Sequence, residues 1–165
     1  YLQEAGLIPK GKAGTGGAVQ ATPEHAALLL LSMGAAVDAK NNAVPLVKVI
    51  GGYTNTNLSR PPDWLNRDLA AALTSGTLTD VLANLLTVAA EDPNYLNELV
   101  TIKVPSQMST VAIDVAGIDG NSREHEFYYS DDIRRPGLTG YVLHLGCSEL
   151  IELSEFFVER NRDTA

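Results

Sequence analysis

The chain has 165 residues, a formal net charge of −8 and a composition that is 45% hydrophobic and 19% charged. This balance is typical of a folded globular protein rather than a disordered one, and no apolar run approaches the roughly 18 to 20 residues that cross a bilayer. The acidic excess excludes a surface that binds nucleic acid throughout, because phosphate contacts need clustered Lys and Arg, so we expect at most a local contact with DNA and none with a membrane.

The first nine residues predict the end of a helix. Apolar side chains recur at roughly helical spacing from Tyr1, and Gly6 is the residue type that most readily adopts the left-handed conformation after a helix. Pro9 cannot continue the helix, and Leu7 and Ile8 are placed to fold back onto it.

The segment from Lys10 to Gln20 contains four glycines, two lysines and no acidic residue. It has almost nothing to bury, so we expect an exposed loop or a two-stranded flap. A phosphate-binding P-loop is not indicated, because Ala13 follows Gly11-Lys12 and no helix opens there.

A second helix is predicted from Thr22. Thr22 can cap it, Pro23 suits its first turn, and Glu24 suits the positive end of the helix dipole. The residues Ala26–Leu31 are apolar on every side of such a helix, which predicts that the helix is buried.

The order of helix end, Gly-Leu-Ile-Pro, basic glycine-rich segment and capped helix resembles the second half of a winged helix-turn-helix DNA-binding domain. The residues YLQEAGLIP are similar to the segment that follows the recognition helix in MerR-like and related phage regulators. The resemblance implies that the wing contacts DNA, with Lys10 and Lys12 on phosphates and Gly14 and Gly16 in the same binding loop. It also implies that most of the recognition helix would lie upstream of Tyr1.

Further helices are expected along the next part of the chain. Val44–Ile50 reads as a short helix that stops at Gly51-Gly52, and Tyr53–Pro62 has no periodicity and reads as a loop. Asp63–Leu73 and Leu78–Ala90 carry apolar stripes that should pack on each other. A dimer seam is an alternative use of the leucine stripe. Pro93 is expected to open a further short helical turn through Leu99.

Past residue 100 the spacing of the apolar residues changes from helical to the alternation typical of strands. The β-branched and aromatic residues alternate in Val100–Val104, Thr110–Ala116, His125–Tyr129 and Tyr141–Leu145. These four runs predict a small antiparallel sheet.

Ser148 is expected to cap a final helix. Helices first, strands next and one helix last indicate an α+β fold. We expect a partial winged-helix region with buried helices in residues 1–52. The helix pair and sheet in residues 53–165 are expected to form an association or sensing domain.

Residues with catalytic chemistry show no useful spacing. His25, His125 and His144 are far apart and belong to no metal-binding pattern, so no enzyme activity, metal or cofactor is expected. His25 reads as a polar boundary residue, and His125 as the exposed start of a strand. Cys147 is the single cysteine, which suits a reducing cytoplasm and a small buried residue.

A second charged segment follows the third predicted strand. Asp131 and Asp132 lie next to Arg134 and Arg135, which suggests mutual neutralisation in a loop rather than an acid/base pair. Arg134 and Arg135 could also bind an anion such as phosphate.

Three hypotheses for the function remain from the sequence. The first is a DNA-binding transcriptional regulator of phage or prophage type that forms a homo-oligomer. The second is a structural or assembly protein in which Lys10–Gln20 is only a flexible linker. The third is a domain that senses a small molecule between sheet and helices, for which apolar pockets leave no clear sequence signature.

Overall fold

The computed structural model describes residues 2–10, 21–35, 43–56, 60–91, 99–105, 110–117, 123–130, 142–145 and 150–155. Its helices are α1 (Pro23–Ala35), α2 (Ala43–Gly51), α3 (Arg67–Thr74) and α4 (Leu78–Glu91). Its strands are β1 (Thr54–Asn55), β2 (Leu99–Pro105), β3 (Val111–Ala116), β4 (Glu124–Ser130) and β5 (Val142–Leu145). Residues 150–155 are also helical.

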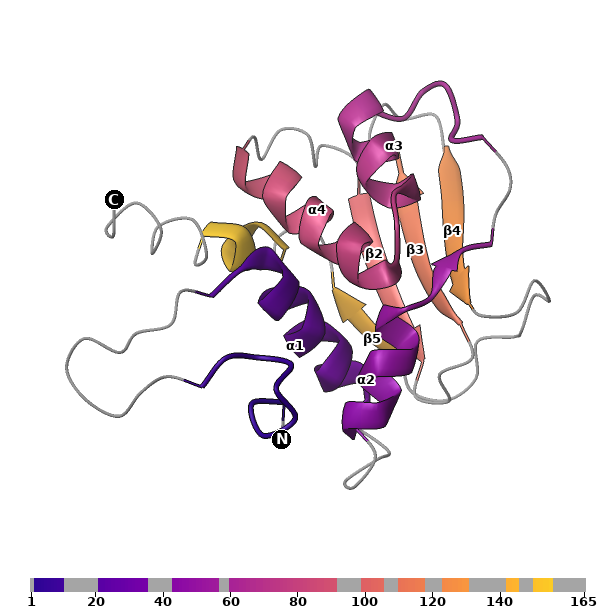
Figure 1. The fold of residues 1–165 in the computed structure, drawn as a ribbon. Helices are drawn as coiled ribbons and strands as arrows, with labels where there is room; N and C mark the ends of the chain where they lie inside the picture. Colours follow the sequence, from indigo (N-terminus) through magenta and orange to yellow (C-terminus); the bar gives the residue numbers. More distant parts are fainter. Residues whose placement is uncertain are drawn as a thin grey trace.

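The strands form one antiparallel sheet in the order β1-β4-β3-β2-β5. Figure 1 shows α1, α3 and α4 gathered on one side of this sheet, with α2 beside α1. The α+β prediction is therefore confirmed, and the four predicted strands are found as β2 to β5 with ends shifted by one residue.

The strand β1 corrects the prediction that Tyr53–Pro62 is entirely a loop. Thr54 pairs with Ser130, Asn55 pairs with Tyr129, and the Thr56 N–H donates to the Tyr128 carbonyl at 2.8 Å. Two residues have no periodicity of their own, so this strand forms because the edge of β4 offers unpaired backbone groups.

The core lies between the sheet and the helices. Alternation along β3 places Val111, Ile113 and Val115 in the core, and Phe127 and Tyr129 of β4 pack with them. The same buried cluster includes side chains from α1 and α2 as well as from α3 and α4. One hydrophobic core thus draws on both predicted regions, 1–52 and 53–165.

The leucine stripes of α3 and α4 belong to this core. Leu69, Leu73, Leu82 and Leu85 are each at most 1% exposed. They pack inside the chain, so they are not available as a dimer seam.

The helix predicted from Asp63 begins later, at Arg67. The side-chain oxygen of Asn66 accepts hydrogen bonds from the N–H groups of Asp68 and Leu69, at 2.8 and 3.3 Å. Asn66 is therefore the cap, and the Leu65 N–H closes a separate turn onto the Pro62 carbonyl.

The helix α1 is only partly buried, contrary to the prediction from its apolar sequence. Ala26, Ala27, Leu30 and Leu31 lie in the core, whereas Leu29 is 45% exposed. A helix that packs with one side on α2 and α4 leaves its other side to solvent, whatever residues stand there.

Candidate nucleic-acid interface

Residues 2–7 form a turn of the kind that terminates helices. The Leu7 N–H donates to the Leu2 carbonyl at 2.9 Å, and the Gly6 N–H donates to the Gln3 carbonyl at 3.3 Å. These two bonds make the Schellman pattern, and Gly6 has the left-handed φ of 71° that the pattern requires. The left-handed conformation expected of Gly6 is therefore present, although the described residues before it form a turn rather than the predicted helix.

Two leucines attach this turn to the body of the protein. Leu2 and Leu7 are partly buried and pack against the core cluster, whereas Lys10 is exposed. Of the predicted DNA contacts, Lys10 therefore stands at the surface directly after an anchored turn. The other three lie outside the described residues, namely Lys12, Gly14 and Gly16.

The other end of the basic segment is the start of α1. The Thr22 carbonyl accepts from the Ala26 N–H at 3.1 Å, as expected of the predicted cap residue. The Thr22 hydroxyl oxygen accepts from the His25 N–H at 3.4 Å, and His25 Nδ1 accepts from the Thr22 N–H at 3.1 Å. His25 takes the place that Glu or Gln holds in a capping box.

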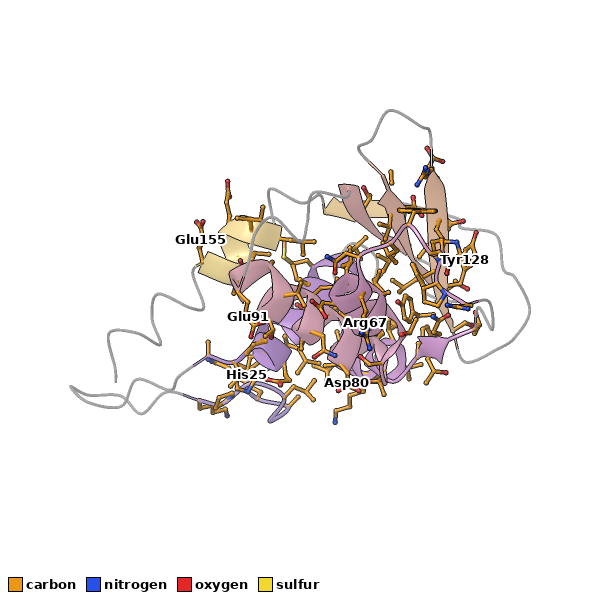
Figure 2. The ribbon with its side chains drawn as sticks, turned by 90° about the horizontal axis from the view of Figure 1, so that it is seen from above. His25, Arg67, Asp80, Glu91, Tyr128 and Glu155 are labelled. Atoms are coloured by element: carbon orange, nitrogen blue, oxygen red, sulfur yellow. The ribbon has the colours of Figure 1, made fainter. Side chains whose placement is uncertain are left out.

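Sequence reasoning missed this role of His25, although the spacing of three residues from a threonine could have indicated it. The first turn of α1 also carries a carboxylate. The Thr22 side chain lowers the pKa of the exposed Glu24 carboxyl by hydrogen bonding, and backbone hydrogen bonding and His25 act in the same direction. Asp80 of α4 raises this pKa slightly, and Figure 2 shows His25 and Asp80 along the same border of the molecule.

The remaining predicted site residues lie outside the described part of the chain. These are Arg134 and Arg135, the neighbouring Asp131 and Asp132, and Cys147. His144 lies in β5, where its backbone pairs with Lys103 of β2.

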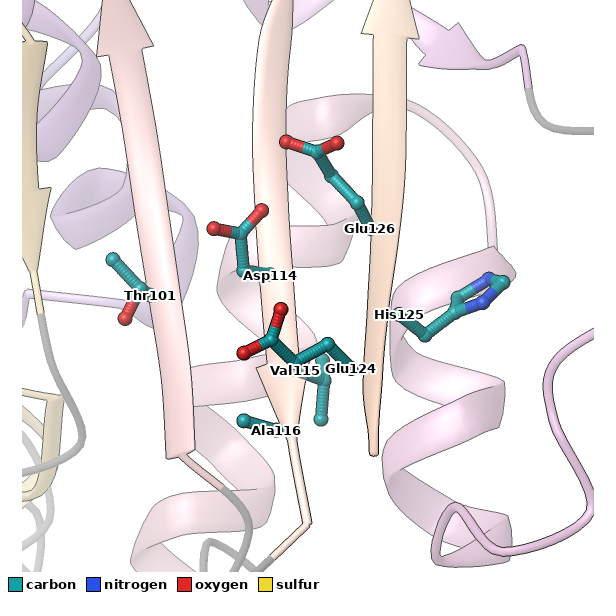
Figure 3. A pocket seen from close by; sticks show the side chains of 7 residues that line it. All are labelled: Thr101, Asp114, Val115, Ala116, Glu124, His125 and Glu126. Atoms are coloured by element: carbon teal, nitrogen blue, oxygen red, sulfur yellow. The ribbon is translucent and has the colours of Figure 1, made fainter. Parts of the chain in front are cut away.

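A hollow lies on the sheet where β2, β3 and β4 meet. Register places Asp114 opposite both Thr101 and Glu126, and Glu124 also lines the hollow. Figure 3 shows Glu124 and Glu126 reaching over β3 toward Asp114, while His125 points away from them. Because its described charged side chains are acidic, this hollow is unsuited to DNA phosphates.

His125 differs from its prediction as an exposed residue at a strand start. It is half-buried, and its ring meets the Phe127 ring edge-on with centroids 4.7 Å apart. Its Nε2 is buried and has no hydrogen-bond partner within the described structure. Alternation of β4 puts His125 on the Phe127 face, and the polar sequence around it concealed this position.

Within the described ranges, no group of three or more His, Cys, Asp and Glu side chains is placed to hold a metal ion. In the same ranges, no helix combines the length and the apolar character needed to cross a membrane. Comparison with protein-family models, with curated proteins and with solved structures gives no match to this chain.

Proposed function

We propose that this chain is part of a DNA-binding transcriptional regulator of the winged helix-turn-helix type, of phage or prophage origin. Lys10–Gln20 acts as the wing, in which Lys10 and Lys12 contact phosphates. Gly14 and Gly16 have no side chain to keep the backbone away from the DNA. Such contacts give position and affinity rather than sequence choice.

The observation that best supports this proposal is the exposed Lys10 between two ordered ends. Leu2 and Leu7 hold the preceding turn against the core, and Thr22 caps the helix that follows. A basic segment tied at both ends can approach DNA without the loss of entropy that a free tail would suffer.

The charge elsewhere in the molecule fits a contact restricted to this segment. The chain as a whole has a net charge of −8, and the hollow on the sheet is lined by Asp114, Glu124 and Glu126. The negative charge of that face would repel DNA, so we expect the sheet to face away from the bound DNA. A cytoplasmic location is part of the proposal, because a regulator must meet DNA and the single Cys147 suits a reducing compartment.

The proposal is tested by the binding of the 165-residue chain to labelled double-stranded DNA of mixed sequence at low salt. We expect the double variant Lys10→Ala, Lys12→Ala to bind at least about tenfold more weakly than the unmodified chain. Lys48→Ala is the matched control, because Lys48 is an exposed lysine that belongs to α2 and not to Lys10–Gln20. An equal loss in the control, or no binding by the unmodified chain, contradicts the proposal.

An assembly module is the second candidate, and one observation favours it. Leu29 and Met33 of α1 are one turn apart, and they are 45% and 55% exposed. Val49 of α2 is 54% exposed, so large apolar side chains stand at the surface of two adjacent helices. Light scattering after gel filtration separates the candidates: a dimer that Leu29→Ser and Met33→Ser convert to monomer, without DNA binding, favours assembly.

A further inference from the structure

The cap of α1 uses a histidine as a hydrogen-bond acceptor. His25 Nδ1 accepts from the Thr22 N–H at 3.1 Å, so the bond requires the tautomer with its proton on Nε2. Imidazole takes up a second proton in mildly acidic water, whereas the usual Glu or Gln of a capping box keeps an acceptor oxygen. We propose that this cap is a pH-sensitive switch, in which protonation of His25 opens the box and loosens the first turn of α1.

Protonation changes the contact between His25 and Thr22 in two ways. The new proton on Nδ1 faces the Thr22 N–H, so two donors oppose each other. The positive charge also lies at the end of α1 where the helix dipole is already positive. Both effects favour rotation of the ring away from Thr22, which leaves the Thr22 N–H to water.

Charged side chains near the cap come from α1 and from the elements packed on it. Glu24 is next to His25 in the first turn, and Asp80 of α4 acts on the same turn through its effect on Glu24. The other described charged side chains on α2 and α4, the helices packed on α1, are Lys48 and Glu91, and residues 2–10 carry Glu4 and Lys10.

The switch does not depend on DNA binding. It acts on the residue at which the chain passes from the glycine-rich segment into α1. If the segment is a wing, an opened cap frees its second attachment; if it is a linker, the cap opens in the same way.

The test is amide hydrogen exchange of the full chain at pH 7.5 and pH 5.5, with each rate divided by the intrinsic rate at that pH. We expect the protection of the Thr22 amide to fall about fivefold at pH 5.5, the fold change of a typical lost cap. The variant His25→Gln, which keeps an acceptor oxygen at both pH values, is expected to retain its protection. Unchanged protection in the wild type, or an equal fall in His25→Gln, overturns the proposal.

A second measurement needs no variant. The ¹⁵N chemical shifts of the His25 ring report which nitrogen carries the proton. At pH 7.5 we expect an unprotonated Nδ1 and a protonated Nε2, as the bond from Thr22 requires. A proton on Nδ1 at pH 7.5 overturns the proposal.

Discussion

The phenolic hydroxyl of Tyr129 donates a hydrogen bond to the backbone carbonyl of Leu73, with 2.6 Å between the two oxygens. Tyr129 lies in the middle of the core and Leu73 near the end of α3, so this bond joins sheet and helix across 56 positions of sequence. Burial raises the pKa of the Tyr129 phenol, which keeps the donor protonated.

Removal of this hydroxyl tests how much the bond contributes. Tyr129→Phe preserves the ring and leaves the Leu73 carbonyl buried without its donor, which costs about 1 to 2 kcal/mol of unfolding free energy. Urea denaturation measures the loss. An unchanged slope of the unfolding free energy against urea concentration would show that the fold is otherwise intact. Wild-type stability in Tyr129→Phe would mean that water replaces the donor.

The start of α4 predicts a loss of stability in acid. The Thr77 N–H donates to Asp80 Oδ2 at 2.8 Å, and this bond, with a second from the Thr77 hydroxyl, lowers the pKa of Asp80. A depressed pKa contributes stability above the unfolded value of about 4, which is lost as the pH falls below it.

The contribution of Asp80 is small because its carboxylate is exposed to water. We expect about 0.5 kcal/mol, the low end of the range for a cap. Asp80→Ala should lose this amount at pH 7 and show a shallower fall in stability between pH 4 and pH 2 than the wild type. If the stability of the two proteins falls in parallel as the pH is lowered, the bonds between Asp80 and Thr77 are not the cause of the loss in acid.

Gly76, in the turn before α4, should tolerate no side chain. Its φ is 72°, and an added Cβ would lie 2.5 Å from Asp80 Oδ2, the atom that caps α4. Gly76→Ala should cost about 1 to 2 kcal/mol, from backbone strain and from displacement of the cap. Gly52→Ala is the matched control, because an added Cβ there meets nothing closer than 3.4 Å and no left-handed φ is required.

The adjacent helices α1 and α4 allow a buried leucine to be compared with an exposed one. Leu85 of α4 is 0% exposed and Leu29 of α1 is 45% exposed. Leu85→Ala should cost about 3 to 5 kcal/mol, whereas Leu29→Ala should change the stability by less than about 1 kcal/mol. Thermal unfolding at low protein concentration measures both. A large cost for Leu29→Ala would indicate that another chain covers α1.

Local signals in the sequence predicted much of the fold. Alternation located β3 and β4, the leucine stripes located α3 and α4, and the residue type of Gly6 predicted its left-handed backbone. These elements depend on neighbours only a few residues away, which a single sequence displays.

The predictions that failed concern features that are set by tertiary contacts. Thr54 is in a strand because Ser130 lies beside it, and nothing within ten residues indicates this pairing. Leu29 is exposed because α1 packs on only one side, which an apolar run cannot reveal. The hollow needs Asp114 beside Glu126, and that neighbourhood depends on the register of β3 and β4. For the candidate interface, Thr22 was predicted as a cap, but the acceptor role of His25 was not.

The salt dependence of DNA binding is the sharpest test of whether Lys10 and Lys12 contact phosphates. The logarithm of the association constant, plotted against the logarithm of salt concentration, has a slope of about −0.9 for each phosphate contact. If Lys10 and Lys12 each neutralise one phosphate, Lys10→Ala with Lys12→Ala should make the slope less negative by about 2, equally for every DNA sequence. A slope identical to that of the unmodified chain would mean that Lys10 and Lys12 make no contact with DNA, and the proposed wing would be wrong.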